Sequence, residues 1–515
     1  MPASARRHLK LSKPGLGVIA LAGLIAFVIL AYQHSPLGPF PVQAASIEVT
    51  TELDTDAVDG VCSLREAIIA ADGDAIRNEC IAGSGDDTIT FAAGVETITL
   101  GSNLPNTTDV AGLTIEGGEV VTIDGDGSRP FPANTGSVTL NDLTVTGAAA
   151  GAVNGGAIAN FGTLTINNTT LSGNMTDAAG GAIANFGTLT INNGVISDNT
   201  AAVSGGGIFN DGGTVTITDS TIGPDNVAGS GGGISNFSSG TTTIIESTIS
   251  GNSSNSSGGG IANGSGQVTL LRTTVGPGNT AQDGGGIYSS SGLTLTNSTV
   301  SGNSATDDGG GIFSPAGTTN LINSTVADNT AADSGGGIYH EAILTVNLTN
   351  SIVALNDPTD CGGNGTFNSN GFNLDSDNTC DLTELTDWPG RTANLGPLQD
   401  NGGPTETYAL LAGSPAINAG NNTACGQAAP TGSAPFDQRG SGFDRISDGI
   451  CDIGAFEVQV APPEEEPTTV PEFVPDPLTP VATRTPVPTP TPVATVPVTA
   501  QAPITPPATG DGGLR

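Results

Sequence analysis

Gly155-Gly-Ala-Ile158 is the first of eight nearly identical stretches that recur along the middle of the chain. Each reads Gly-Gly-Ala-Ile or Gly-Gly-Gly-Ile, and successive isoleucines lie 25, 25, 26, 27, 26, 25 and 26 residues apart. So regular a period predicts a stacked repeat, in which each unit buries its apolar face against its neighbours. The isoleucines are Ile158, Ile183, Ile208, Ile234, Ile261, Ile287, Ile312 and Ile338.

Within each unit, an alternating stretch such as Thr163-Leu-Thr-Ile166 follows the glycines, and then a short segment such as Leu171-Ser-Gly-Asn174. Alternation with period 2, rich in Thr, Val and Ile, predicts strands, and no window in the repeat has a helical period. We expect about three short strands per unit, separated by Gly, Asn, Ser and Asp corners. Stacking predicts an all-β fold over residues 82–350, a right-handed parallel β-helix with coils of about 25 residues, capped at both ends.

Asparagines recur two positions after the isoleucines. Because an Asn side chain both donates and accepts, a column of them can hydrogen-bond from coil to coil. We interpret this column as a structural ladder. It comprises Asn160, Asn185, Asn210, Asn236 and Asn263.

The composition excludes several chemistries. The 515-residue chain has a formal charge of −37, and both lysines lie within the first 13 residues. Nine arginines and all 50 acidic residues lie beyond residue 45. Nucleic acid is therefore excluded as an expected partner, since neutralising phosphates requires Lys and Arg. The acidic surface favours solubility, with loose binding of divalent cations as the alternative.

The two termini have the composition of export and attachment segments. In residues 1–45, basic residues precede an apolar run from Leu16 to Ala31, and Val42-Gln-Ala44 offers a cleavage site. We expect a cleaved signal peptide, with an uncleaved membrane anchor as the alternative. Residues 458–515 are rich in Pro and Thr and predict an extended stalk. Pro506-Pro-Ala-Thr-Gly510 resembles a degenerate sorting signal of the LPxTG type.

Residues 46–81 contain Val61-Cys-Ser-Leu-Arg-Glu-Ala-Ile68, and Leu64 to Ala71 is the best short-helix candidate in the chain. The stretch resembles the CSLREA domain, a small module at the N-terminus of secreted bacterial β-helix proteins. That resemblance implies export and a β-helix behind the module, but no activity. We expect an N-terminal cap here, stabilised by an ion pair between Arg65 and Glu66.

Residues 351–457 lose the coil pattern and contain Leu395-Gly-Pro-Leu398, Gly413-Ser-Pro-Ala-Ile417, Asp437-Gln-Arg-Gly440 and Cys451-Asp-Ile-Gly-Ala-Phe-Glu457. Together these motifs resemble the choice-of-anchor Q domain of bacterial surface proteins. Asn418 stands where that family usually has Asp, and Ile446 where Pro is common. The family implies no catalytic residue. We expect a C-terminal cap over the last coil.

In this cap, Arg439 should pair with an acidic residue such as Asp437 or Asp452. The six cysteines fall as neighbours along an exported chain, which favours local disulfides over the other connectivities. The expected pairs are Cys62 with Cys80, Cys361 with Cys380, and Cys425 with Cys451.

Asp375, Asp377 and Asp381 lie in one short polar segment and are the candidate ligands for a calcium ion. We expect no other cofactor.

Catalytic residue types are scarce in the repeat. A lyase needs a basic residue, and Arg272 is the only Arg or Lys of the regular coils. Asp307 and Asp308 are interpreted as turn residues, and His340, beside Glu341, has no triad partners. We therefore expect no enzyme. The alternative is a polysaccharide lyase or glycoside hydrolase of the pectin-lyase-like fold.

Aromatic side chains recur at two positions of the repeat. Phe161, Phe186 and Phe237 lie three places after their isoleucines. Four others lie one place after: Phe209, Tyr288, Phe313 and Tyr339. We expect these rings to pack over the corners. The alternative is that Phe161, Phe186 and Phe237 point outward and form a strip that binds carbohydrate.

These inferences predict an exported, monomeric bacterial cell-surface protein. It would serve as an adhesin or as part of the envelope, attached through its N-terminal segment or its stalk. A polysaccharide or another surface ligand is the expected partner.

Overall fold

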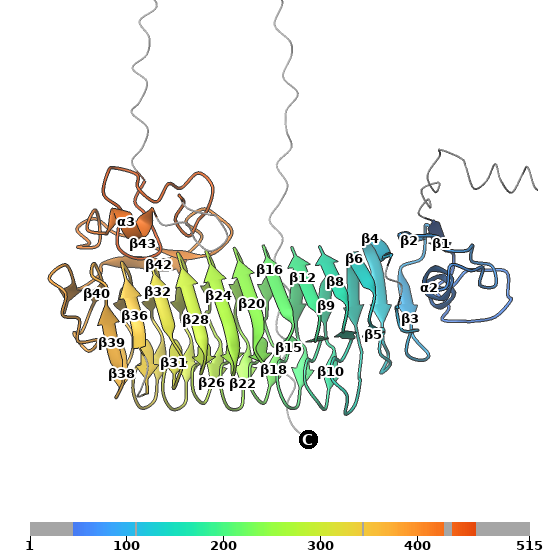
Figure 1. The fold of residues 1–515 in the computed structure, drawn as a ribbon, viewed down its shortest axis with the longest axis horizontal. Coiled ribbons are helices and arrows are strands. Elements are labelled where there is room, and N and C mark those ends of the chain that lie inside the picture. Colours follow the sequence, from blue (N-terminus) through green and yellow to red (C-terminus); the bar gives the residue numbers. More distant parts are fainter. Residues whose placement is uncertain (1–44, 109–110, 342–344, 427–434, 460–515) are drawn as a thin grey trace, which may run out of the picture. The chain divides into compact units, whose positions relative to one another are not determined.

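The structure is a computed structural model that describes residues 45–108, 111–341, 345–426 and 435–459, and it is a parallel β-solenoid (Figure 1). The predicted export segment and nearly all of the stalk lie outside these residues. A regular coil contains four strands, one more than expected: β7 (Ile158–Asn160), β8 (Thr163–Asn167), β9 (Thr170–Ser172) and β10 (Met175–Thr176). The fourth strand has only two residues, which is too short for an alternating pattern to be seen in the sequence. In the described part of the chain, no helix is long and apolar enough to cross a membrane.

Equivalent strands of successive coils pair in parallel, one above the other. The column of β7 contains β5 (Phe131–Asn134), β11 (Ile183–Asn185), β15 (Ile208–Asp211), β19 (Ile234–Phe237), β23 (Ile261–Asn263), β27 (Ile287–Ser289), β31 (Ile312–Ser314), β35 (Ile338–His340) and β38 (Cys361–Gly363). The column of β10 contains β14 (Thr200–Ala201), β18 (Val227–Ala228), β22 (Ser253–Ser254), β26 (Thr280–Ala281), β30 (Ser304–Ala305) and β34 (Thr330–Ala331).

The columns of β8 and β9 join into one sheet, because β4 (Leu113–Asp124) and β6 (Ser137–Thr146) run through both. The column of β8 contains β12 (Thr188–Asn192), β16 (Thr214–Thr218), β20 (Gly240–Ile245), β24 (Gly266–Leu271), β28 (Gly292–Thr296), β32 (Thr319–Ile322), β36 (Thr345–Thr349) and β39 (Thr366–Ser369). The column of β9 contains β13 (Val195–Ser197), β17 (Thr221–Ile222), β21 (Thr248–Ile249), β25 (Thr274–Val275), β29 (Thr299–Ser301), β33 (Thr325–Ala327), β37 (Ile352–Ala354), β40 (Leu374–Asp375) and β41 (Trp388–Pro389).

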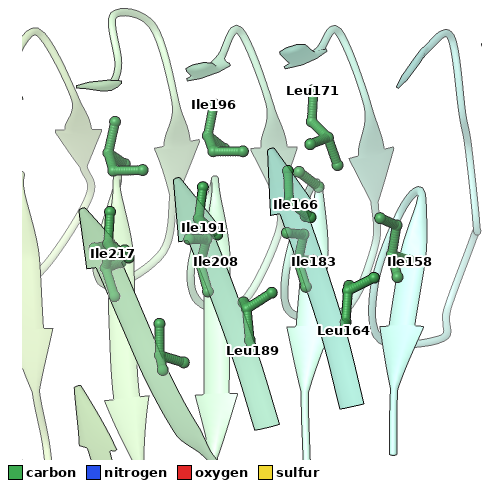
Figure 2. Close-up of a cluster of buried hydrophobic side chains, with 14 of the residues drawn as sticks. Ile158, Leu164, Ile166, Leu171, Ile183, Leu189, Ile191, Ile196, Ile208 and Ile217 are labelled. Carbon is green, nitrogen blue, oxygen red and sulfur yellow. The ribbon is translucent and has the colours of Figure 1, made fainter. Parts of the chain in front are cut away.

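The core is a thin stack of aliphatic side chains. Ile158, Ile183 and Ile208 lie one above another in parallel register and are fully buried (Figure 2). Leucines and isoleucines of the β8 and β9 columns close the core from the other sides. Because full burial of one such side chain stabilises by about 1.5–3 kcal/mol, this repetition of a few contacts holds the solenoid together.

Two asparagine ladders run through the interior. The predicted ladder is confirmed: the Asn210 side-chain amide donates to the Asn236 carbonyl oxygen over 2.8 Å, and both residues are buried. A second ladder follows the β9 column, where Asn252 donates to Asn279 over 3.0 Å. Each rung satisfies polar groups that would be costly to bury unpaired.

The N-terminal segment belongs to the solenoid. β1 (Ser46–Val49) pairs in parallel with β2 (Asp87–Phe91), and β3 (Thr97–Thr99) pairs with β4. The predicted helix is α2 (Leu64–Asp72), which begins with a capping box between Ser63 and Glu66. The expected Arg65–Glu66 ion pair is wrong, because Glu66 caps the helix while Arg65 pairs with Asp54 at 2.7 Å.

All three expected disulfides are confirmed: Cys62–Cys80, Cys361–Cys380 and Cys425–Cys451. The coils continue past the expected boundary at residue 350, since β36 pairs with β39 and β37 with β40. The antiparallel pair β42 (Leu395–Gln399) and β43 (Thr407–Leu410) and the short helix α3 (Asn422–Cys425) come after the last coil.

The described residues between 395 and 457 lie along the flank of the solenoid. The sequence instead predicts a cap over the last coil. The Thr274 hydroxyl donates to the Glu406 carbonyl oxygen over 2.8 Å. Farther along, Asn297 donates to the Phe436 carbonyl oxygen and Asn350 to that of Asp452. The contacts reach back from the end across several coils.

Arg439 organises this flanking segment. Its guanidinium pairs with buried Asp437 at 2.6 Å and lies between two rings, 4.0 Å from the centroid of Phe443 and 3.8 Å from that of Phe456. The same group donates to the Glu457 carbonyl oxygen. The predicted ion pair within this region is confirmed, with Asp437 as the partner.

Candidate functional site

Two of the three phenylalanines of the predicted strip form a stack on the surface. Phe161 follows β7 and Phe186 follows β11, so parallel register places one above the other. Their ring centroids are 4.8 Å apart and their planes differ by 7°. Phe161 is 51 % exposed, so the expectation that it packs over a corner is wrong.

Phe237 is in the same column but apart from that stack. Its partner in the preceding coil is Asp211, which interrupts the aromatic column. Phe237 is 52 % exposed and therefore also points outward. The sequence thus predicts the right column, and the register shows that only two of its rings touch.

A second aromatic column contains four rings, of which three stack; the fourth, Phe209, is half-buried and lies beside Ala184 and Ser235 of the neighbouring coils. Phe313 lies between Tyr288 and Tyr339, with centroid distances of 5.5 and 5.1 Å and nearly parallel planes. Phe313 is 7 % exposed, so the prediction that it packs is confirmed, whereas both tyrosines are half-buried. Tyr339 hydrogen-bonds to Asp308, so this column adjoins a line of carboxylates.

An acidic cluster forms at the end of the solenoid, although one predicted member is replaced. Asp375 and Asp377 are brought together with Asp360, and their nearest carboxylate oxygens lie within 4.8 Å of one another. Asp381 is not in this group; it is exposed and has a φ of 50°. Asp360 belongs to the preceding coil, so only the parallel stacking brings it here.

The three carboxylates accept hydrogen bonds from the surrounding backbone. Asp375 accepts from the Cys380 N–H over 2.9 Å, Asp377 from the Asp360 N–H over 2.9 Å, and Asp360 from the Ser376 N–H over 2.9 Å. Burial, helped by the neighbouring carboxylates, raises the pKa of Asp375 to about 7. Burial also raises the pKa of Asp360.

These raised pKa values predict a pH-dependent stability. A carboxyl group that binds its proton more tightly in the folded protein stabilises the fold fully below its unfolded pKa, near 4, and this contribution is lost as the pH rises to about 7. We expect the melting temperature to fall between pH 5 and pH 8, and Asp375→Asn to flatten that slope. Thermal denaturation of both proteins at several pH values measures it.

Glu457 provides the internal comparison, because burial raises its pKa to about 8 on the flanking segment. Glu457→Gln should remove the upper part of the slope and leave the part due to Asp375. A slope unchanged by Asp375→Asn would contradict the assignment.

The residues considered for catalysis are dispersed. Asp307 and Asp308 precede β31, whereas Arg272 lies at the turn between β24 and β25, a different corner of the coil. His340 is fully buried, its Nδ1 lies 2.8 Å from the Ser314 carbonyl oxygen, and its ring is T-shaped against that of Phe367, with centroids 6.1 Å apart. Glu341 is exposed.

Arg272 instead joins a charged group that the sequence analysis missed. Its Nε donates to Glu246 of the preceding coil over 2.7 Å, and Asp219, one coil earlier still, hydrogen-bonds to Glu246. Burial and the Glu246 charge raise the pKa of Asp219. Asp219 and Glu246 line a pocket of about 290 Å³ that Pro404 of the flanking segment closes on one side.

A pattern in the repeat could have identified this group. All three residues occupy the turn between the β8 and β9 columns, where the backbone has a φ near 50° and Asn is usual. Three successive coils replace that Asn with a charged residue. The nine residues of this turn are Asp142, Asn168, Asn193, Asp219, Glu246, Arg272, Asn297, Asn323 and Asn350.

Comparison with known proteins gives one partial match. Residues 297–315 match the Chlamydia polymorphic membrane protein repeat. They comprise β29 to β31, including one Gly-Gly-Gly-Ile motif, so this coil is similar to that repeat. No curated protein and no solved structure matches the chain. The resemblances to the CSLREA and choice-of-anchor Q domains stay predictions.

Proposed function

We propose that this protein is a bacterial surface solenoid that binds saccharides without transforming them. The stack of Phe161 and Phe186 carries this proposal, because Phe161 is half exposed and the two rings lie one coil apart in nearly parallel planes. Exposed apolar surface of this kind marks an interaction site. The apolar C–H faces of sugar rings would pack on it, and Arg129 and Asn154, which line a pocket beside the rings, would bond sugar oxygens.

Three features support a location outside the cytoplasm. Three disulfides are typical of oxidising compartments, and no free cysteine is found in the described residues. One coil is similar to a repeat of Chlamydia polymorphic membrane proteins. The N-terminal composition predicts export. An adhesin that displays its flanks on the cell surface accounts for all three.

A glycan array probed with the whole protein tests this proposal. We expect binding to at least one class of saccharide, and a loss of tenfold or more when Phe161 and Phe186 are both changed to Ala. Val203→Ala is the matched control, because Val203 is an exposed apolar residue outside both aromatic columns. An array without signal, or a double variant that binds as well as the parent, would contradict the proposal.

We further propose that Asp360, Asp375 and Asp377 bind a structural calcium ion, since carboxylate oxygens are ligands that suit calcium. Millimolar calcium should raise the melting temperature at pH 8, where the carboxyls are ionised, and EDTA should reverse the change. Asp375→Asn should abolish it, and an equal response in that variant would exclude this site.

The second candidate function is a polysaccharide-active enzyme, favoured by the paired carboxyls of Asp219 and Glu246 beside Arg272. One of two such carboxyls can hold a proton while the other is ionised, as acid–base catalysis requires. Product release from polysaccharides that is lost in Asp219→Asn would establish this function. The absence of product from any saccharide bound on the array would exclude it.

A further inference from the structure

Arg129 is a buried arginine that stands apart from the acidic residues of this chain. Its side chain precedes β5 and is 8 % exposed, and its Nε is buried without a hydrogen-bond partner. One amino group donates to the Asn154 carbonyl oxygen. Burial lowers the pKa of Arg129 to about 10, so the guanidinium stays positive at neutral pH.

The other structurally described arginines show how unusual this is. Four of them form ion pairs with carboxylates: Arg65, Arg77, Arg272 and Arg439. Arg391 forms no ion pair within the described residues, but it is exposed to solvent. Buried Arg445 is surrounded by Glu457, Asp437 and Asp452, whose charges raise its pKa against the effect of burial. Arg129 forms no ion pair in the described part of a chain that has 50 acidic residues. A buried cation without a counter-charge is costly, so this one calls for an anion.

A surface pocket lies against this arginine. Its volume is about 340 Å³, and it is lined by Arg129, Pro132, Ala152, Val153, Asn154, Ala159, Phe161 and Phe186. The lining thus combines one cation with the stacked phenylalanines and contains no carboxylate. The volume is near the lower limit of the roughly 300–1,000 Å³ typical of ligand pockets, enough for one ring and its substituents.

We propose that this pocket binds a sugar residue that carries a single carboxylate, and this proposal rests on the saccharide-binding function proposed above. The carboxylate would accept charge-assisted hydrogen bonds from Arg129 while the sugar ring lies against Phe161 and Phe186. The planar guanidinium suits a carboxylate because both are flat and bidentate. The ligand supplies the counter-charge that the protein lacks here.

The charge of the protein favours one isolated anion over a polyanion. The chain has a net charge of −37, which repels an extended polyanion, but this repulsion is screened beyond about 8 Å at physiological ionic strength. A single acidic residue in an otherwise neutral saccharide escapes most of it. The expected ligand is therefore an oligosaccharide with one uronic acid unit and otherwise neutral sugars.

Titration calorimetry of the whole protein tests the proposal. The probes are an oligoglucoside that ends in glucuronic acid, the same compound after reduction of its carboxyl group to the alcohol, and polyglucuronate. We expect the acidic oligosaccharide to bind at least tenfold more tightly than its reduced form and than each uronate of the polymer. Binding should weaken as sodium chloride is raised.

Variants then assign the binding to this pocket. Arg129→Gln and Phe161→Ala should each weaken binding of the acidic oligosaccharide tenfold or more. Ala152→Trp, at an exposed position on the rim, should block the pocket without touching Arg129, and so serves if Arg129→Gln fails to fold. Phe237→Ala is the matched control, because Phe237 is as exposed as Phe161 but does not line the pocket.

Equal affinity for the acidic and the reduced oligosaccharide would overturn the inference, as would unchanged binding in Ala152→Trp. If the protein binds only neutral saccharides, this inference fails while the general saccharide-binding function stands. If the glycan array is silent for every saccharide, both fail.

Discussion

Gly206→Ala is expected to destabilise its coil by roughly 3 kcal/mol or more, the upper end of what overpacking costs. Gly206 is the second glycine of its repeat motif, where the backbones of adjacent coils approach closely. A Cβ there would lie 2.3 Å from the Gly232 carbonyl oxygen and 2.6 Å from the Val227 nitrogen. Both are backbone atoms, so relief requires neighbouring coils to separate.

Gly207→Ala is the matched control, one residue along the chain. Its Cβ would lie 2.8 Å from the Gly233 carbonyl oxygen and 3.1 Å from a methyl group of Ile196. Earlier coils already have alanine at this place, as Ala157 and Ala182. We expect Gly207→Ala to lower the free energy of unfolding by less than about 1 kcal/mol, because the coils already accommodate alanine at this place.

Hydrogen exchange of the Gly206 and Gly207 variants measures the difference, because it reports the opening of individual coils. Similar losses of protection in both would contradict this account of the motif.

Arg439→Met is expected to cost about 3–5 kcal/mol, because it leaves the carboxylate of Asp437 buried without its cation. The methionine also removes the group that lies between Phe443 and Phe456. We expect the flanking segment to detach while the coils stay folded. Limited proteolysis should then cut between residues 395 and 457 at a rate at least tenfold above that of the parent.

Asp437→Asn with Arg439→Met is the informative companion variant. If the cost arises from the orphaned carboxylate, the double variant should be more stable than Arg439→Met alone. A double variant that is less stable would show that the contact of the guanidinium with the two rings dominates. Equal proteolysis of parent and Arg439→Met would contradict the organising role of Arg439.

The fold of the regular coils follows from the sequence because every determinant repeats. Ile208 and Asn210 predict their own environment, since the same residues stand about 25 positions before and after them. Local order along the chain also predicted the disulfides. The fourth strand was missed because Met175–Thr176 is too short to show a period.

The flanking segment could not be predicted, because its contacts join distant parts of the chain. The Gln438 amide donates to the Thr274 hydroxyl, 164 residues away, and no local pattern encodes such a pairing. For the same reason the acidic cluster was predicted with Asp381, its neighbour in sequence, when its third member is Asp360.

The candidate binding surface was predicted in part. The column of Phe161, Phe186 and Phe237 follows from the repeat, but the outward direction of the rings depends on the corner geometry. Arg129 gave no signal, since it lies in the irregular coils before the repeat and belongs to no motif.

The flanking segment has a mechanical consequence. Coils that contact only their neighbours would unfold one by one under a pulling force, and each would need only a small force. The backbone carbonyl oxygens of Glu406, Phe436 and Asp452 accept hydrogen bonds from three different coils and so tie that part of the solenoid into one block. Tension applied near residue 457 must first break this brace, so a surface protein held by its C-terminal side would resist shear as a unit and yield abruptly.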